Sequence, residues 1–144
     1  IRRQRQMCIR DSLECGTLNI AGILSLRAGI AFVKKTGTAA ILQHETTCCN
    51  KFLSMLQTMP QVTVYRQPGA AYAPIVSFNI QNLSSEETAE LLDQKGFCLR
   101  AGLHCAPLAH RAIGTIDGGT VRFAPSIFNT LPEVVALGNA IRNL

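Results

Sequence analysis

Hydrophobic residues recur at helical spacing in the first part of the chain. From Ile20 to Lys35 they cover nearly the whole circumference of the predicted helix, a pattern typical of a helix that other parts of a protein cover on several sides. A second helical pattern runs from Ile41 to Met59, with Thr36 or Thr38 as its N-cap and Pro60 after its end. The sequence therefore predicts two helices before the first strand.

The period changes to two in the middle of the chain. Residues 62–65 and 75–80 alternate apolar and polar positions, and the Gln67-Pro68-Gly69 segment between them favours a turn. Residues 97–100 and 120–123 predict two more short strands, the second after an Asp-Gly-Gly turn. We therefore expect four short strands.

Two capping boxes mark the starts of further helices, at Ser84–Glu87 and at Thr130–Glu133. The first of these helices should run to Lys95 and end at Gly96. A short helix is expected over residues 105–113. This order of elements predicts an α+β fold, in which helices pack against one face of a small, largely antiparallel sheet.

Composition narrows the class of protein. The chain has 144 residues, of which 47% are hydrophobic and 16% charged, so it can bury a core. No apolar run reaches the roughly 20 residues that span a bilayer, so no membrane partner is expected. Its six cysteines stand in irregular positions without a signal peptide, so we expect free thiols and a cytoplasmic location rather than a disulfide framework.

The basic charge is concentrated at the N-terminus. Residues 2–12 match the translation of an adapter used in transposase-made sequencing libraries, so we interpret residues 1–12 as a read-through scar. Without their four arginines and one aspartate the net charge falls from +5 to +2. A genuine basic arm is the alternative. With the scar excluded, we expect no nucleic-acid partner.

Cys105 is the first candidate for chemistry. It follows a glycine-containing loop and opens the predicted short helix, where free amide N–H groups and the helix dipole favour a thiolate. The neighbouring His104 and Arg100 would favour the thiolate as well, and a thiolate is the nucleophilic form of cysteine. The alternative is a cysteine buried as a small hydrophobic residue.

Arg122 and Thr17 are candidates for binding anions. Arg122 lies between Val121 and Phe123 in a predicted strand, so its side chain should project to the opposite face. There it is either solvated or, in a cleft, able to hold a carboxylate in a bidentate bond. The Gly16-Thr17 pair precedes a helix and could present amides and a hydroxyl to an anion. No metal site is predicted, because metal-ligand spacings of Cys and His are missing.

Three segments together resemble one family. Residues 100–106 are similar to the Arg-x-Gly-x-His-Cys-Ala active-site loop of cysteine desulfurases, in the SUF-type group of the class V aminotransferase superfamily of pyridoxal-phosphate enzymes. Residues 13–19 resemble the family's Glu-x-Gly-Thr-x-Asn motif. Residues 120–123, followed by 128–130, resemble its Val-Arg strand and the Asn-Thr after it. The likeness spans nearly all of residues 13–144.

The resemblance implies a role for each matching residue. Cys105 would attack the sulfur of cofactor-bound L-cysteine, become a persulfide and release alanine. Arg122 would hold the substrate carboxylate, and Thr17 would reach the cofactor phosphate, commonly across a homodimer interface in this family. Arg100 and His104 would shape the loop and its electrostatics.

This sequence departs from the family pattern at the lysine that binds the cofactor. In the family it lies upstream of the Glu-x-Gly-Thr motif, and none of the four lysines here stands in a matching context. The resemblance thus implies that residues 13–35 end a large cofactor domain and that residues 36–144 form the C-terminal small domain. Such a piece would be inactive alone, whereas the full-length enzyme would bind pyridoxal phosphate and pass sulfur to an acceptor protein.

Two alternatives stay open at this stage. One keeps the superfamily and changes the reaction, to that of a selenocysteine lyase or another class V enzyme. The other is a free-standing, non-catalytic, thiol-bearing binding domain. Substrate comparison on the completed protein distinguishes the first, and the contiguous genomic DNA distinguishes the second.

Overall fold

The computed structural model describes residues 17–67 and 69–144. The chain divides into two compact units, Ile1–Thr38 and Ala39–Leu144. The predicted adapter-derived residues 1–12 lie outside the described residues. So do residues 13–16, which include Gly16 and most of the segment that resembles the Glu-x-Gly-Thr-x-Asn motif. The assignment of residues 13–35 and 36–144 to two domains of an enzyme stays a prediction.

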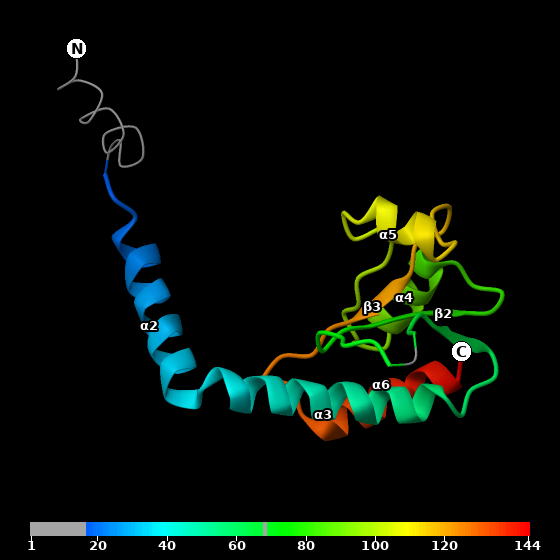
Figure 1. Ribbon diagram of the computed structural model, residues 1–144, viewed down its shortest axis with the longest axis horizontal. Helices are drawn as coiled ribbons and strands as arrows, with labels where there is room; N and C mark the ends of the chain where they lie inside the picture. Colours follow the sequence, from blue (N-terminus) through cyan, green and yellow to red (C-terminus); the bar gives the residue numbers. More distant parts are fainter. Residues whose placement is uncertain (1–16, 68) are drawn as a thin grey trace, which may run out of the picture. The chain divides into compact units, whose positions relative to one another are not determined.

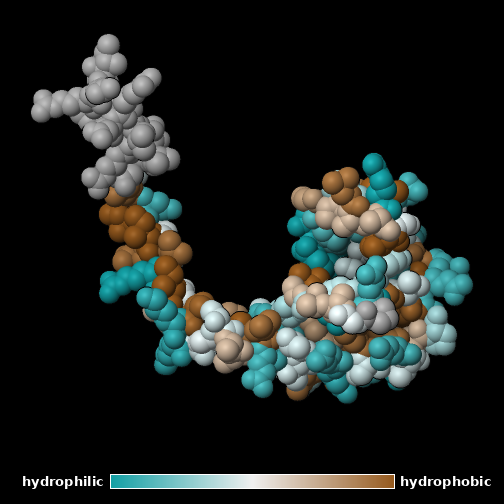
Figure 2. Space-filling view, viewed as in Figure 1, coloured by the Kyte–Doolittle hydropathy of each residue, from teal (hydrophilic) through white to brown (hydrophobic). Residues whose placement is uncertain are grey.

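The first unit contains helix α2 (Ile20–Thr36), close to its predicted bounds. Asn19 caps it, because its Oδ1 accepts a hydrogen bond from the Gly22 amide at 2.9 Å. None of its residues is buried, and Ile20 and Leu26 are 63% and 64% exposed. The hydrophobic side chains of α2 are visible as brown atoms in Figure 2. The helix that the sequence predicts to be covered is therefore exposed over residues 20–35.

A three-stranded antiparallel sheet forms the centre of the second unit. Its strands β1 (Val62–Val64), β2 (Val76–Ile80) and β3 (Val121–Phe123) lie in the order β1-β2-β3. Alternate residues of β2 and β3 are buried, so one face of the sheet is apolar and the other carries polar side chains. The predicted alternation is thus confirmed for these strands.

Two long helices cover the apolar face of the sheet. Helices α3 (Thr38–Leu56) and α6 (Leu131–Arg142) run along the same side of it in Figure 1. Phe52 of α3 lies between two strands, with its ring centroid 5.6 Å from that of Phe78 and 4.3 Å from that of Phe123. Cys48 and Cys49 join the same core. The α+β class and the small antiparallel sheet are confirmed.

Helix α4 (Ser85–Asp93) connects the sheet to the loop before β3. Both bonds of the predicted capping box form, from the Ser84 amide to Glu87 at 2.8 Å and from the Glu87 amide to Ser84 at 3.1 Å. The Ser85 hydroxyl donates to the Gly118 carbonyl at 2.6 Å. The start of α4 therefore fixes the turn that leads into β3.

Two sequence predictions are corrected near residue 100. Residues 97–100 do not form a strand of the sheet, because only Arg100 pairs, in a single bridge to Arg122. Helix α5 spans Pro107–Ala112 and begins two residues after Cys105. His104 and Cys105 adopt positive φ angles of 51° and 58°, which a right-handed helix excludes, whereas Pro107 suits a first helical turn.

Candidate active site

The loop that carries Cys105 is hydrogen-bonded to strand β3. The Arg122 amide donates to the Arg100 carbonyl at 2.8 Å, and Gly102 and Thr120 exchange amide-to-carbonyl bonds of 3.1 and 3.2 Å. Residues 100–102 therefore run antiparallel beside residues 120–122. Two segments that the sequence singled out separately thus lie side by side.

This pairing requires a glycine at position 119. Gly119 has a φ of +61°, and a Cβ atom built on it would lie only 2.5 Å from the carbonyl carbon of Gly102. The Gly119 carbonyl in turn accepts a hydrogen bond from Asn79 Nδ2 at 3.0 Å. The Cys105 loop and the turn before β3 are therefore in close contact, and the hydrogen bond from Asn79 of β2 holds this turn in place.

His104 ties the loop to β3 a second time. Its Nε2 lies 2.9 Å from the Thr120 carbonyl oxygen, and a nitrogen bonded to a carbonyl must donate. That oxygen thus accepts both the Gly102 amide and the imidazole. Burial lowers the pKa of His104, the bond to Thr120 opposes this effect, and the charges of Arg122 and Arg100 add to it. His104 is thereby kept as a neutral donor near pH 7.

Cys105 follows His104 and is exposed to solvent. Its backbone is left-handed, so the side chain leaves a tight turn and does not continue a helix. Cys48 and Cys49 contrast with it, because burial raises the pKa of both thiols, that of Cys49 to about 11. Cys98 is also exposed, with its Sγ 3.5 Å from Asp93 Oδ1. Among the described cysteines, two are thus accessible for reaction and two are not.

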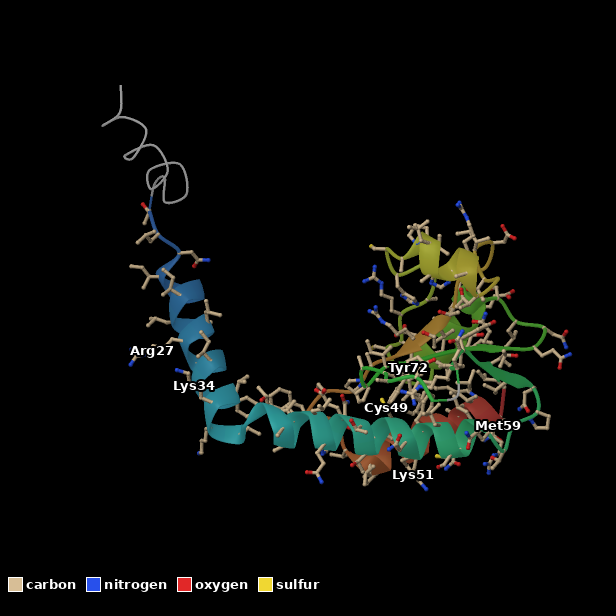
Figure 3. All side chains as sticks on the ribbon, viewed as in Figure 1. Arg27, Lys34, Cys49, Lys51, Met59 and Tyr72 are labelled. Atoms are coloured by element: carbon tan, nitrogen blue, oxygen red, sulfur yellow. The ribbon has the colours of Figure 1, made fainter. Side chains whose placement is uncertain are left out.

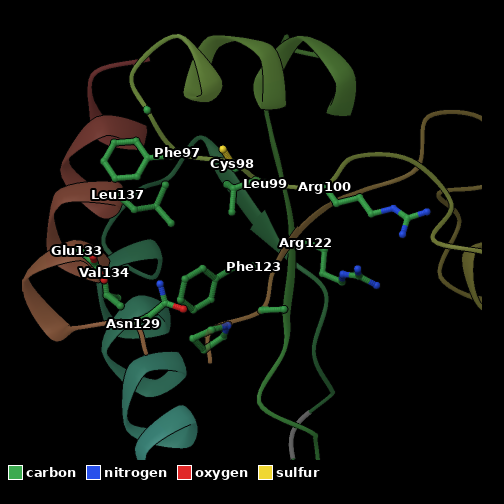
Figure 4. Close-up of a pocket in the computed structure, with 13 residues that line it drawn as sticks. Phe97, Cys98, Leu99, Arg100, Arg122, Phe123, Asn129, Glu133, Val134 and Leu137 are labelled. Atoms are coloured by element: carbon green, nitrogen blue, oxygen red, sulfur yellow. The ribbon is translucent and has the colours of Figure 1, made fainter. Parts of the chain in front are cut away.

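Arg100 and Arg122 point the same way from the edge of the sheet. Val121 and Phe123 are buried, so Arg122 projects from the polar face, and the single bridge places Arg100 directly opposite on that face. Figure 4 shows both guanidinium groups on one side, away from Phe97. They border a pocket of about 490 Å³ whose lining also includes Phe97, Leu99 and Phe123. Arg122 thus lies beside a cleft.

The other predicted residue, Thr17, belongs to the first unit. It is exposed and precedes the cap of α2. The structure therefore pairs Arg100 with Arg122 and bonds His104 to Thr120, while Cys105 follows in the loop and does not line the pocket beside the two arginines. Thr17 belongs to the other unit.

The four lysines of the chain are candidates for a Schiff base with a cofactor aldehyde, and the structure shows where each one lies. Lys51 lies on the side of α3 that faces away from the sheet (Figure 3), and Lys95 Nζ donates to the Ala140 carbonyl at 3.4 Å. These are the two lysines of the second unit, and Lys34 and Lys35 end α2 in the first. That none of these four lysines binds pyridoxal phosphate covalently stays a prediction.

Sequence reasoning missed the residues that support the loop. Asn79, Ser85 and Thr120 carry common polar side chains, and only their long-range hydrogen bonds give them a role. Gly119 belongs to a predicted turn, but its contact with Gly102 requires knowledge of the fold.

The described part of the chain, residues 17–67 and 69–144, lacks the features of a metal or membrane site. In those residues, no group of three or more His, Cys, Asp or Glu side chains is placed to hold a metal ion. No helix there has the length and apolar character needed to cross a bilayer.

Comparison with known proteins places these features in a family. The sequence profile named aminotransferase class-V matches residues 6–137. The chain belongs to this family. Because the match begins at residue 6, it overlaps the segment that we interpret as a scar, and that interpretation stays a prediction.

Relatives of the chain within this family are named cysteine desulfurases. A probable cysteine desulfurase of Methanothermobacter thermautotrophicus is 33% identical over 133 residues, which are 91% of this chain and 33% of that protein. A cysteine desulfurase of Synechococcus elongatus is also 33% identical over 133 residues and is covered over 20% of its length. The chain thus spans about a third or less of these curated relatives.

Solved structures of cysteine desulfurases share the fold. The apo structure of a cysteine desulfurase from Thermococcus onnurineus matches with a TM-score of 0.81 and 30% identity, over 90% of this chain and 32% of that one. The cysteine desulfurase CsdA from Escherichia coli, described as an S-sulfonic acid form, matches with a TM-score of 0.78 and 25% identity, over 90% and 31% of the two chains. The SUF-type subgroup stays a prediction.

Proposed function

We propose that this chain is the C-terminal part of a pyridoxal-phosphate-dependent cysteine desulfurase that converts L-cysteine to alanine and an enzyme persulfide. The observation that carries the proposal is the exposed Cys105 in a loop whose stem pairs with the strand of Arg122. The desulfurase names of the relatives support the same assignment.

Two residues of this chain perform the proposed substrate chemistry. The planar fork of Arg122 binds the carboxylate of L-cysteine through two charge-assisted hydrogen bonds. The Cys105 thiolate attacks the substrate sulfur, so a sulfur–sulfur bond forms as the substrate carbon–sulfur bond breaks. Pyridoxal phosphate, when bound, serves as an electron sink that makes this carbon–sulfur bond cleavable. The substrate and the Cys105 thiol thus become alanine and a Cys105 persulfide.

His104 and Arg100 hold the loop for this reaction. The imidazole and the Gly102 amide share the Thr120 carbonyl, while the Arg100 carbonyl accepts the Arg122 amide. These bonds fix the backbone on both sides of Gly102, and Cys105 follows directly. A persulfide on an exposed residue at the end of this loop can be reached by a sulfur-acceptor protein.

The cofactor side of the enzyme is supplied mainly by residues that this chain lacks. Thr17 reaches the cofactor phosphate, in a homodimer across the subunit interface, and a Schiff-base lysine would come from the part of the full-length enzyme that this chain does not span. The chain alone is therefore expected to be inactive. The full-length enzyme acts in the cytoplasm.

The test uses the full-length protein. The chain is joined to the upstream region found in contiguous genomic DNA, loaded with pyridoxal phosphate, and assayed for alanine and for sulfide in the presence of a thiol reductant. We expect Cys105→Ala to lower alanine release at least about 100-fold, as loss of a nucleophile does. Cys98→Ala is the matched control, because it removes the other exposed thiol, and it should keep activity.

Other outcomes decide against the proposal. Unchanged alanine release in Cys105→Ala would remove the nucleophile from the mechanism. Selenocysteine turnover with no cysteine turnover would make the enzyme a selenocysteine lyase. A start codon directly before Leu13 would favour the non-catalytic thiol-bearing domain.

A further inference from the structure

His104 holds the Cys105 loop to β3 through only one of its ring nitrogens. Its Nε2 donates to the Thr120 carbonyl at 2.9 Å, so in the neutral ring Nδ1 carries a lone pair and no proton. Nδ1 is buried, and no described residue offers it a hydrogen-bond partner. The bond to Thr120 therefore needs only the neutral form of the imidazole.

The surroundings of the ring are unfavourable for a second proton. Protonation would make Nδ1 a donor, and a buried donor without an acceptor loses its hydration without replacing it. Burial therefore lowers the pKa of His104, against the opposing hydrogen bond to Thr120. The charges of Arg122, His110 and Arg100 lower this pKa further. His110, on α5, has its ring centroid 5.9 Å from that of His104.

Two neighbouring side chains have possible acceptor atoms, and neither bonds to Nδ1 of His104. His110 has its own Nδ1 2.8 Å from Thr115 Oγ1. Glu86 of α4 faces Gly102, with Oε1 3.9 Å from a Cβ atom built on that glycine, and it is not among the charges that shift the pKa of His104. While the loop lies on β3, the Nδ1 of a charged His104 thus has no partner among the described residues.

We infer that His104 is a proton-sensitive switch for the Cys105 loop. The neutral imidazole holds residues 102–105 on β3, and this is the closed loop. When Nδ1 takes up a proton from solvent, the charged ring leaves its buried position for water, its bond to Thr120 breaks and the loop opens. The switch itself follows from this geometry. Its effect on catalysis rests on the proposed function, in which the closed loop holds Cys105 for attack on the substrate sulfur.

The direction of the pH dependence follows from the two forms of the loop. In the open loop His104 takes up its proton at the ordinary pKa of 6.5, and in the closed loop at a lower pKa. Above pH 6.5 neither form is protonated, so the fraction of closed loop is constant. As the pH falls from 6.5 toward the lower value, only the open form gains protons, and the closed fraction decreases.

The experiment measures hydrogen exchange of the Gly102 amide by NMR, in the 144-residue chain without cofactor, from about pH 5 to about pH 8. This amide donates to the same Thr120 carbonyl at 3.1 Å, so its protection relative to an unstructured peptide reports the closed loop. Protection should be constant above pH 6.5 and should fall below it, by up to about tenfold per pH unit. The ring nitrogen resonances of His104 should show the proton on Nε2 at the highest pH.

Variants assign the pH dependence to His104. His104→Gln places an amide donor near the position of Nε2 and cannot titrate, so the protection of Gly102 should no longer depend on pH. His44→Gln is the matched control, because His44 Nε2 also lies 2.8 Å from a backbone carbonyl, that of Asn129 before α6. It should leave the pH dependence at Gly102 unchanged. His110→Asn removes the other imidazole beside the ring and should retain this pH dependence too.

Several results would overturn the switch. These are constant or rising Gly102 protection in the unmodified chain as the pH falls below 6.5, an unchanged pH dependence in His104→Gln, and its loss in His44→Gln or His110→Asn. Failure of the proposed desulfurase reaction would leave the Gly102 result standing. Constant Gly102 protection together with Cys105-dependent alanine release would overturn only this inference.

Discussion

Gly119 shows how closely a single residue limits the site. A side chain at this position would be strained by the positive φ. It would also clash with Gly102, because an added Cβ atom would lie only 2.5 Å from its carbonyl carbon. The neighbouring Gly118 has nothing within 4 Å of such an atom and no positive φ. The two adjacent glycines therefore differ in what a side chain would do to the Cys105 loop.

We predict that Gly119→Ala lowers the free energy of unfolding by about 2–4 kcal/mol, because it adds left-handed strain and a backbone clash. Gly118→Ala, as the control, should cost less than about 1 kcal/mol. Urea unfolding of the 144-residue chain followed by circular dichroism gives both values. Equal costs for the two variants would contradict the close approach to Gly102.

The sequence indicates the candidate reactive and binding residues of the site, but it does not indicate the residues that hold their loops in place. Cys105 and Arg122 stand out in the sequence because the segments around them resemble two motifs of one family. Asn79 and Ser85 cannot be found in this way, since each acts through one hydrogen bond to a residue more than 30 positions away. Long-range partners of this kind depend on the fold.

At the scale of elements, local signals are the most informative. The starts of α4 and α6 follow from their capping boxes, because the bonds involved join residues only three apart. The strand predicted over residues 97–100 is wrong, since alternation favours a strand wherever it occurs, whereas among these four residues only Arg100 pairs with β3. The predicted start of α5 at Cys105 is wrong because two left-handed residues cannot be inferred from the sequence.

We predict that the capping box makes the stability of the chain depend on pH through Glu87. Its hydrogen bonds with Ser84 hold the pKa of Glu87 below the ordinary value of 4.5, so folding favours the ionised carboxylate. This contribution is complete above pH 4.5 and is lost as the pH falls below it, through the lower value of the folded state.

The comparison is between the unmodified chain and Glu87→Gln, with urea unfolding at several pH values. The variant should be less stable at pH 7, and the difference should shrink as the pH falls below 4.5. Glu90→Gln on the same helix removes a carboxylate that has no bond to the cap and is the matched control. A Glu87→Gln difference that is constant with pH would contradict the role of the cap.

At the scale of the whole molecule, the chain exposes a helix that its composition suits to an interior. Seven large apolar side chains of α2 are at least 39% exposed: those of Ile20, Ile23, Leu24, Leu26, Ile30, Phe32 and Val33. The relatives are about three times longer than the matched segment, so covering residues can come from the part that this chain does not span. The sequence of this chain predicts that other residues cover α2, and it does not identify those residues.

We predict that the 144-residue chain associates with itself through α2, since contiguous apolar surface of this kind promotes association. Replacing Leu26 and Ile30 together by lysine should shift the chain toward monomer in sedimentation velocity experiments. Replacing Leu108 by lysine, an apolar side chain on α5 that is 75% exposed, should leave the association unchanged. A monomeric unmodified chain would contradict the prediction.

The Thr120 carbonyl has a consequence for how the Cys105 loop moves. Because one oxygen accepts both the Gly102 amide and the His104 imidazole, the segment cannot swing outward without breaking both bonds at the same moment. Displacement of the thiol toward a partner should thus be an all-or-none event with a single barrier, rather than a gradual drift. In a relaxation-dispersion experiment, Gly102, His104 and Cys105 would then share one exchange rate.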